Sequence, residues 1–217
     1  MDFRWQVFVE ALPALLKGAR VTAELTLISM ALGVAIGLAG GLGRVSRFRL
    51  VRAAWAAYVV AMRGIPVLVT LMFLYYGLPS LGIQFTAYTV AIIGLSLTNG
   101  AYVTEIVRAG IQSIDRGQMH AARSLGMSYL LAMRRVILPQ AFRRILPPLT
   151  NEAITLLKST SLVSAIAISE LLRSGLEVMT WKANTFSPFF GVAAIYLAMT
   201  LPLIALVAYM ERRYRIE

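Results

Sequence analysis

The sequence contains no cysteine and a single histidine, His120. Disulfide bonds and thiolate metal sites are therefore excluded, and so is a metal site built from several histidines. Charged residues are also scarce, at 14% of the chain, where a soluble domain carries about a quarter. The sequence has no glycine-rich phosphate-binding loop that ends in lysine and a hydroxyl residue, so we expect neither ATP binding nor a cofactor in this chain.

The chain instead contains long hydrophobic segments. Hydrophobic residues make up 59% of its 217 positions, and the mean hydropathy is +0.73. One core cannot hide so much apolar surface, so lipid must cover much of it. Because a bilayer core takes about 20 apolar residues as helix, we predict an all-α integral membrane protein with five transmembrane helices, at about 21–42, 53–78, 85–107, 141–171 and 188–210.

Prolines predict irregularities in two of these spans. Pro66 follows Arg63 and Gly64 in the second span, and Pro147 and Pro148 stand near the start of the fourth. Because proline cannot donate to the helical hydrogen-bond ladder, we expect a bend or a new helix start at each place.

The basic residues predict the orientation. The formal net charge is +11, and basic residues gather at 44–52, 116–144 and 212–215, which follow alternate spans and so fall on one side. Excess lysine and arginine mark the cytoplasmic side, so the N-terminus is expected outside and the C-terminus inside. The chargeless connection 77–84 and a mixed loop at 173–187 then lie outside. We assign the positive charge to this orientation and expect no nucleic-acid partner.

The cytoplasmic segment at about 113–139 predicts two short helices around a turn. Ser113 or Asp115 can cap the first helix, and Gly126 can take the left-handed conformation that closes it. Ser128 can cap the second, and Pro139 ends it or begins the next span. From spacing alone, this segment could pack on its own bundle or present a surface to another protein; a DNA-reading helix pair is disfavoured by the flanking spans.

This segment resembles a known motif. Its pattern is similar to the EAA loop of ATP-binding-cassette (ABC) importer permeases, with His120 where the family has glutamate; the matching positions are Ala121, Ala122, Gly126, Ile137, Leu138 and Pro139. The resemblance narrows to polar amino-acid permeases through segments 15–26, 63–66, 75–79, 99–105 and 156–162.

The resemblance implies the membrane domain of a type I ABC importer, a single permease domain over 1–217 in the bacterial cytoplasmic (inner) membrane. It implies a non-catalytic subunit that works with two cytoplasmic ABC ATPase subunits, a second permease copy or a paralogue, an extracytoplasmic amino-acid-binding protein that docks on the outer loops, an amino-acid substrate and membrane lipid. The coupling helix would enter a groove of the ATPase, with contacts from His120, Ala121, Ala122, Leu125 and Gly126.

Polar groups at membrane depth are candidates for the substrate path, because they are costly unless they face a cavity or a partner. They are Asn99, Glu105, Glu152, Lys158, Ser159, Thr160 and Ser161. We hypothesise that Lys158 and the hydroxyls that follow it meet a substrate carboxylate, while Glu105 or Glu152 meets its ammonium group. Structural pairing is the alternative: Glu105 with Arg108, and Lys158 with Glu152 or a helix end. Arg63 is interpreted as an anchor or structural partner.

Two other classes of function are a membrane enzyme and an ion-coupled carrier or channel. A membrane enzyme needs a nucleophile, base or metal ligands gathered at one depth, and the chain offers no such group. An ion-coupled carrier or channel could use Glu105, Glu152 and Lys158 as relay groups, but would have no need of the cytoplasmic two-helix segment. On the outer side, Glu170, Arg173, Glu177 and Lys182 offer charge for docking.

Overall fold

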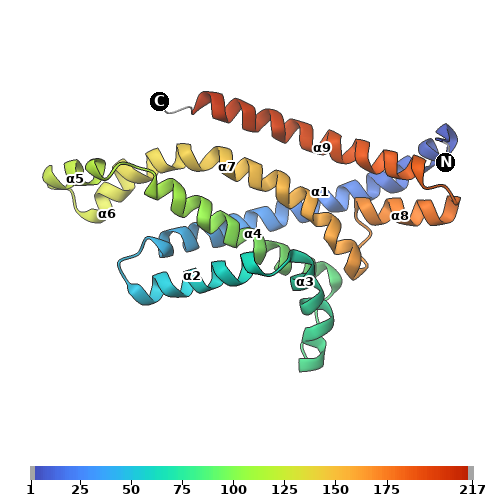
Figure 1. Ribbon diagram of the computed structural model, residues 1–217, viewed down its shortest axis with the longest axis horizontal. Helices are drawn as coiled ribbons and strands as arrows, with labels where there is room; N and C mark the ends of the chain where they lie inside the picture. Colours follow the sequence, from blue (N-terminus) through green and yellow to red (C-terminus); the bar gives the residue numbers. More distant parts are fainter. Residues whose placement is uncertain (1–2, 215–217) are drawn as a thin grey trace.

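A computed structural model describes residues 3–214 of the chain (Figure 1). Within that range the regular structure is entirely helical. Arg215, at the end of the third basic block, lies outside the described residues. The elements in order are α1 (Trp5–Arg44), α2 (Arg49–Gly64), α3 (Val67–Met72), a π-helical turn η1 (Phe73–Gly77), η2 (Leu78–Leu81), α4 (Ala87–Gln112), α5 (Arg116–Ser124), α6 (Tyr129–Ala132), η3 (Met133–Ile137), α7 (Leu138–Ser159), η4 (Thr160–Ile166), α8 (Leu171–Lys182) and α9 (Phe186–Arg213).

The helices account for the five predicted spans. Three of them, α1, α4 and α9, are each long and apolar enough to cross a membrane. Two bent pairs bring the number to five if each pair is one span: α2 with 67–81, bent by 99°, and 129–166 with α8, bent by 50°. The bend in the second span was predicted from Pro66, which stands between the end of α2 and the start of α3.

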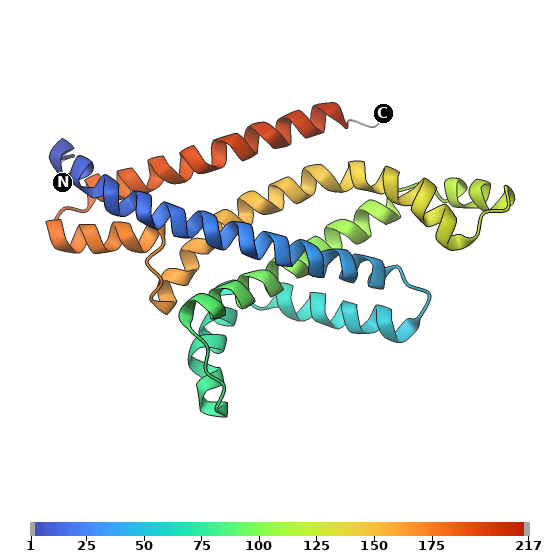
Figure 2. The ribbon, with the colours of Figure 1, turned by 180° about the vertical axis from the view of Figure 1, so that it is seen from behind.

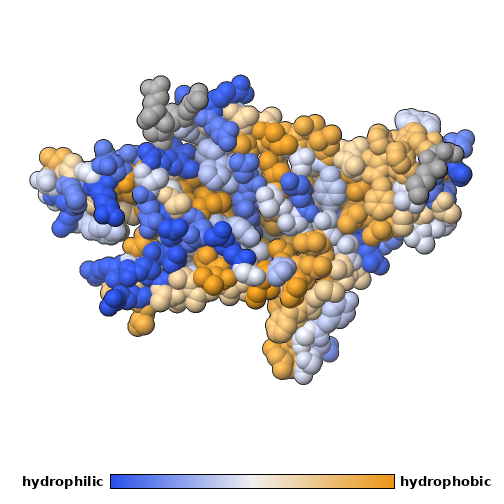
Figure 3. Space-filling model, viewed as in Figure 1, coloured by the Kyte–Doolittle hydropathy of each residue, from blue (hydrophilic) through white to orange (hydrophobic). Residues whose placement is uncertain are grey.

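The three basic blocks lie toward one end of the molecule. Figures 1 and 2 show the α1–α2 turn, the α5–α6 segment and the last turns of α9 at this end, with α8 and the start of α1 at the opposite end. Hydrophilic residues gather over the α5–α6 end, and hydrophobic residues cover much of the middle (Figure 3). The alternation of basic loops along the sequence therefore predicted their common side.

Three details of the predicted spans are wrong. The first helix begins at Trp5 rather than near 21, because its N-terminal half packs against α8 and α9. Pro147 and Pro148 lie inside a continuous α7, and the fourth span breaks instead at η4, where Ala167 takes a left-handed conformation. Neighbouring helices allow proline within a spanning helix. The segment expected as a loop at 173–187 is mostly helix α8.

Helices α1 and α4 pack closely because small residues line their contact. A Cβ atom on Gly33, Gly37 or Gly41 would overlap the side chains of Asn99, Val103 and Val107, respectively. Glycines four residues apart let two backbones approach, which is how helices associate when both are surrounded by lipid.

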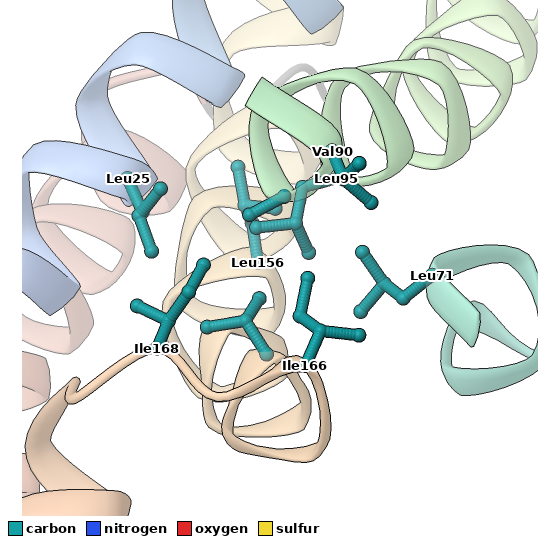
Figure 4. Packing of buried hydrophobic residues seen from close by; sticks show 9 residues of the cluster. Leu25, Leu71, Val90, Leu95, Leu156, Ile166 and Ile168 are labelled. Atoms are coloured by element: carbon teal, nitrogen blue, oxygen red, sulfur yellow. The ribbon is translucent and has the colours of Figure 1, made fainter. Parts of the chain in front are cut away.

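Next to this contact, buried side chains from α1, α3, α4, α7, η4 and the chain just after η4 form one apolar cluster (Figure 4); it includes Leu25, Leu71, Val90, Leu95, Leu156, Ile166 and Ile168. The cluster fixes α7 beside α4.

Candidate functional site

A groove follows the contact between α4 and α7. Its wider part has a volume of about 550 Å³ and is lined by residues that include Arg63, Glu105, Arg144 and Glu152. A narrower part of about 90 Å³ continues among Asn99, Thr155 and Ser159. Tyr102 and Glu152 line both parts, so the two are sections of one groove.

Asn99 and Glu152 form the polar contact of the narrow part. The amide nitrogen Nδ2 of Asn99 donates to Oε1 of Glu152 at 3.0 Å. Asn99 is 2% exposed, and its Oδ1 atom has no hydrogen-bond partner within residues 3–214. A buried acceptor without a donor is costly in a folded protein. The groove therefore offers the Glu152 carboxylate to a ligand that carries N–H groups, whereas the Asn99 Oδ1 atom faces Gly33 of α1.

Glu105 is already paired within the bundle. Its Oε2 atom lies 2.7 Å from Nη2 of Arg108, and its Oε1 atom lies 3.3 Å from Nε of Arg44. The pairing with Arg108 that the sequence offered as an alternative is present, and Arg44 adds a second cation from α1. Glu105 thus joins α1 to α4 at the basic end of the groove, and two arginines balance its charge.

The polar run at the end of α7 divides between the groove and the bundle. Ser159 lines the narrow part, although its hydroxyl donates to the Thr155 carbonyl at 2.9 Å. Thr160 is completely buried and donates to the Leu157 carbonyl, and the Ser161 hydroxyl donates to the Lys158 carbonyl. Both hydroxyls therefore donate to backbone carbonyls at the junction between α7 and η4.

Lys158 is exposed and lines neither part of the groove. It forms no ion pair with Glu152 or with any other carboxylate that the structure describes. The arrangement thus brings together Asn99, Glu105, Glu152 and Ser159, and leaves Lys158 elsewhere.

Arg63 and Tyr102 line the groove and were not among the predicted site residues. The guanidinium carbon of Arg63 lies 5.1 Å from the centre of the Tyr102 ring. Tyr102 follows Asn99 by three residues on α4, so the two side chains lie on the same face of the helix. This spacing could have identified Tyr102 from the sequence. No sequence signal placed Arg63 there, because its position depends on how α2 packs against α4.

The cytoplasmic segment has the predicted local structure. The Asp115 carboxylate caps α5 by accepting the Gly117 amide at 2.7 Å, and Gly126 has a φ of +81° just after α5. The Ser128 hydroxyl caps α6 by accepting the Leu131 amide at 3.3 Å, and Pro139 lies in the first turn of α7.

The same segment projects beyond the long helices at the basic end (Figure 2). Large apolar side chains on it face outward: Leu125 is 80% exposed and Leu130 is 77% exposed. His120, Ala121 and Gly126 are exposed as well, whereas Ala122 is buried. Exposed leucines at the tip of a projecting hairpin are typical of a surface that another protein covers.

On the opposite side, Glu170 is completely buried, contrary to its expected place among the docking charges. It caps α8 by accepting the amides of Leu172 and Arg173 at 2.9 and 2.8 Å, and it accepts the Tyr196 hydroxyl of α9 at 3.0 Å. Its carboxylate is therefore used in joining α8 to α9. Among residues 3–214, no three His, Cys, Asp or Glu side chains come close enough to hold a metal ion.

Comparison with known proteins gives consistent matches over the whole chain. Residues 30–216 match the family described as "Binding-protein-dependent transport system inner membrane component". The chain is 38% identical to the probable amino-acid ABC transporter permease protein YckA of Bacillus subtilis, over 98% of this chain and 94% of that protein. It is 34% identical to the glutamine transport system permease protein GlnP of Escherichia coli K12, over the full length of both.

Solved structures agree with these matches. The structure titled "Crystal structure of an amino acid ABC transporter with histidines" has 38% identity and a TM-score of 0.93, and the match covers 98% of this chain and 100% of that one. An inward-facing form of the MetNI methionine ABC transporter shares the fold at 20% identity, with a TM-score of 0.74 and a match covering 93% of this chain and 95% of that one.

Proposed function

The chain belongs to the family of binding-protein-dependent transport system inner membrane components and is the permease subunit of an ABC amino-acid importer, and we propose that its α4–α7 groove is the part of the substrate path that this subunit contributes. As such a permease it is a multi-pass protein of the bacterial inner membrane and a non-catalytic subunit. The family match decides against the ion-coupled carrier or channel that the sequence left open.

The observation that carries the proposal is the contact between Asn99 and Glu152. A half-buried carboxylate, held by a buried amide, lies inside a groove that continues to the basic end of the molecule. Polar groups of this kind are retained within membranes where they line a path. We assign the substrate ammonium group to Glu152, whose carboxylate lines both parts of the groove.

The groove is partly open to its surroundings, so the proposal requires a second permease, either an identical copy or a paralogue, to close the path. Membership of a binding-protein-dependent ABC system implies a cytoplasmic ATPase and an extracytoplasmic binding protein. We propose two ATPase subunits, each receiving one projecting segment 113–139. Their closure would move the two permeases against each other and switch the path between outward and inward access. Relatives of this chain are named for glutamine, arginine and cystine transport, and we propose an α-amino acid as the substrate here.

Uptake by the assembled transporter tests the groove. The complex, purified with its ATPase and binding protein, would be reconstituted in vesicles and given ATP with L-glutamine, L-arginine or L-cystine. We expect Glu152→Gln to lower uptake at least about tenfold, because a charge-assisted hydrogen bond contributes about 1.5–3 kcal/mol. Glu24→Gln is the control, since Glu24 lies outside the groove and pairs with Arg20. Uptake by Glu152→Gln at the wild-type rate, with the ATPase still bound, would exclude the proposed path.

A further inference from the structure

The turn between α1 and α2 carries a group of arginines without acidic partners. Arg47, Arg49 and Arg52 are exposed. Within residues 3–214, none of them forms an ion pair with a carboxylate. The sequence itself has no Asp or Glu from 25 to 104, so no nearby part of the chain can supply one. The positive charge of this turn therefore remains available to an anion from outside the chain.

Large apolar side chains are exposed at the same turn. Phe48 is 58% exposed and directly precedes α2, and Leu50 is 86% exposed in the first turn of that helix. The guanidinium carbon of Arg47 lies 4.8 Å from the centre of the Phe48 ring, and this stacking leaves the N–H donors of the arginine available. Cations interleaved with apolar side chains suit the boundary between lipid headgroups and acyl chains, where each kind of group has its own medium.

The backbone of the turn is fixed by packing. A Cβ atom on Gly43 would overlap the ring of Trp55, so α2 lies directly against the end of α1. Across the turn, the Arg52 guanidinium donates to the Ser46 carbonyl at 3.4 Å. The exposed side chains between these contacts therefore project from a backbone that is already in place, which lowers the entropic cost of binding.

The turn lies where a membrane-spanning helix ends. The apolar part of α1 runs as far as Leu42, and the basic turn follows directly. The α5–α6 segment extends further than this turn at the same end of the molecule (Figure 2). The surface that we assign to the ATPase thus lies beyond the arginines of the turn. This position favours a lipid headgroup over a soluble protein as their partner.

We propose that the α1–α2 turn binds the headgroup of an anionic phospholipid in the cytoplasmic leaflet. Arg47 and Arg49 donate to the phosphate oxygens, while Phe48 and Leu50 enter the apolar layer beside the acyl chains. The planar fork of arginine matches phosphate oxygens, and each cation near an anionic membrane surface adds to the attraction. A zwitterionic lipid has the same phosphate, but its own cation offsets the charge. This surface is separate from the α4–α7 groove, so the proposal stands or falls independently of the substrate path.

Photolabelling tests the proposal on the intact complex. The purified permease–ATPase complex in mild detergent would receive a trace of phosphatidylglycerol with a photoreactive group, and mass spectrometry would locate the labelled peptide after illumination. We expect labelling within residues 45–52. Unlabelled phosphatidylglycerol should abolish it at a concentration at least about tenfold lower than phosphatidylcholine does.

A double variant assigns this preference to the turn. In Arg47→Gln combined with Arg49→Gln, the two lipids should compete within about threefold of each other. Arg52 is kept because it closes the turn. The matched control is Lys17→Gln combined with Arg20→Gln, which removes two exposed cations at the opposite end of α1, where two carboxylates line the same cavity. It should retain the preference of the wild type.

Four results would overturn the proposal, and three of them need no variant to fold. Equal competition by the two lipids would show ordinary lipid contact without selection for charge. Competition by glycerol phosphate as effective as that by phosphatidylglycerol would show a site for a soluble anion. Absence of label from 45–52 in the complex would show that a protein surface covers the turn. The fourth is a double variant that still prefers phosphatidylglycerol tenfold.

Discussion

The side-chain amide of Asn99 donates a 3.0 Å hydrogen bond to the carboxylate of Glu152, a residue 53 positions further along the chain. This contact joins α4 to α7 at the narrow part of the groove. The Asn99 side chain also packs against α1, where Gly33 leaves just enough room for it. One hydrogen bond thus connects the bundle's closest helix contact with the proposed substrate path.

Replacing Asn99 by leucine should impair both stability and transport. The change removes the donor to a half-buried carboxylate, which costs about 1–3 kcal/mol when the carboxylate stays charged. Thermal unfolding in detergent and amino-acid uptake in vesicles would measure the two effects. Asn151→Leu is the control, because Asn151 is an exposed asparagine on α7 that does not line the groove. Equal melting temperatures and uptake rates for both variants would contradict the prediction.

The packing of α1 on α4 predicts a large effect from one added methyl group. Gly37→Ala places a Cβ atom against the Val103 side chain, and overpacking of this kind costs about 1–3 kcal/mol. Gly64→Ala adds the same atom where no neighbour lies within 4 Å. Unfolding by sodium dodecyl sulfate should therefore begin at a lower detergent fraction for Gly37→Ala than for Gly64→Ala. The reverse order would show that α1 and α4 do not pack as described.

The buried carboxylate of Glu170 should be essential to the stability of the outer end of the molecule. Glu170→Ala leaves the amides of Leu172 and Arg173 and the Tyr196 hydroxyl without their acceptor. At about 1–3 kcal/mol for each unsatisfied group, we expect a loss of about 3 kcal/mol or more. Glu177→Ala removes an exposed ion pair with Arg173 and should cost at most about 1 kcal/mol. Comparable unfolding curves for the two variants would show that Glu170 is not a structural link.

The projecting segment should determine whether the ATPase stays bound. Leu125→Ser combined with Leu130→Ser removes two exposed apolar side chains from the tip, and loss of such anchors typically costs more than about 2 kcal/mol of binding. ATPase recovered with the tagged permease should fall at least about tenfold. Leu50→Ser is the control, since Leu50 is 86% exposed in the first turn of α2, on the same side of the molecule.

A single substitution tests the turn of that segment. Gly126 has a φ of +81°, a conformation that costs a residue with a side chain about 1–2 kcal/mol. Gly126→Arg also places a bulky cation beside the exposed Leu125. We expect it to release the ATPase while leaving amino-acid binding in the groove intact. Full ATPase recovery with Gly126→Arg would indicate that the coupling contact lies elsewhere.

Local structure followed from the sequence wherever the cause was local. Asp115, Gly126 and Ser128 cap and close the two cytoplasmic helices because capping depends on residues two or three positions away. Pro66 predicted the bend in the second span for the same reason. The break predicted at Pro147 and Pro148 is wrong, because α7 continues through both prolines and neighbouring helices stabilise it there.

The sequence by itself determined that lipid surrounds much of the protein, and it determined the five spans. It also determined the common side of the basic loops and the motif that identifies the family. Each of these depends on composition or on spacing along the chain. The tertiary structure alone decided which polar side chains share a cavity. It placed Arg63 beside Glu152, left Lys158 outside and buried Glu170. The physical reason is that helix rotation and crossing, which set the direction of each side chain, come from packing between helices, and no residue encodes that packing alone.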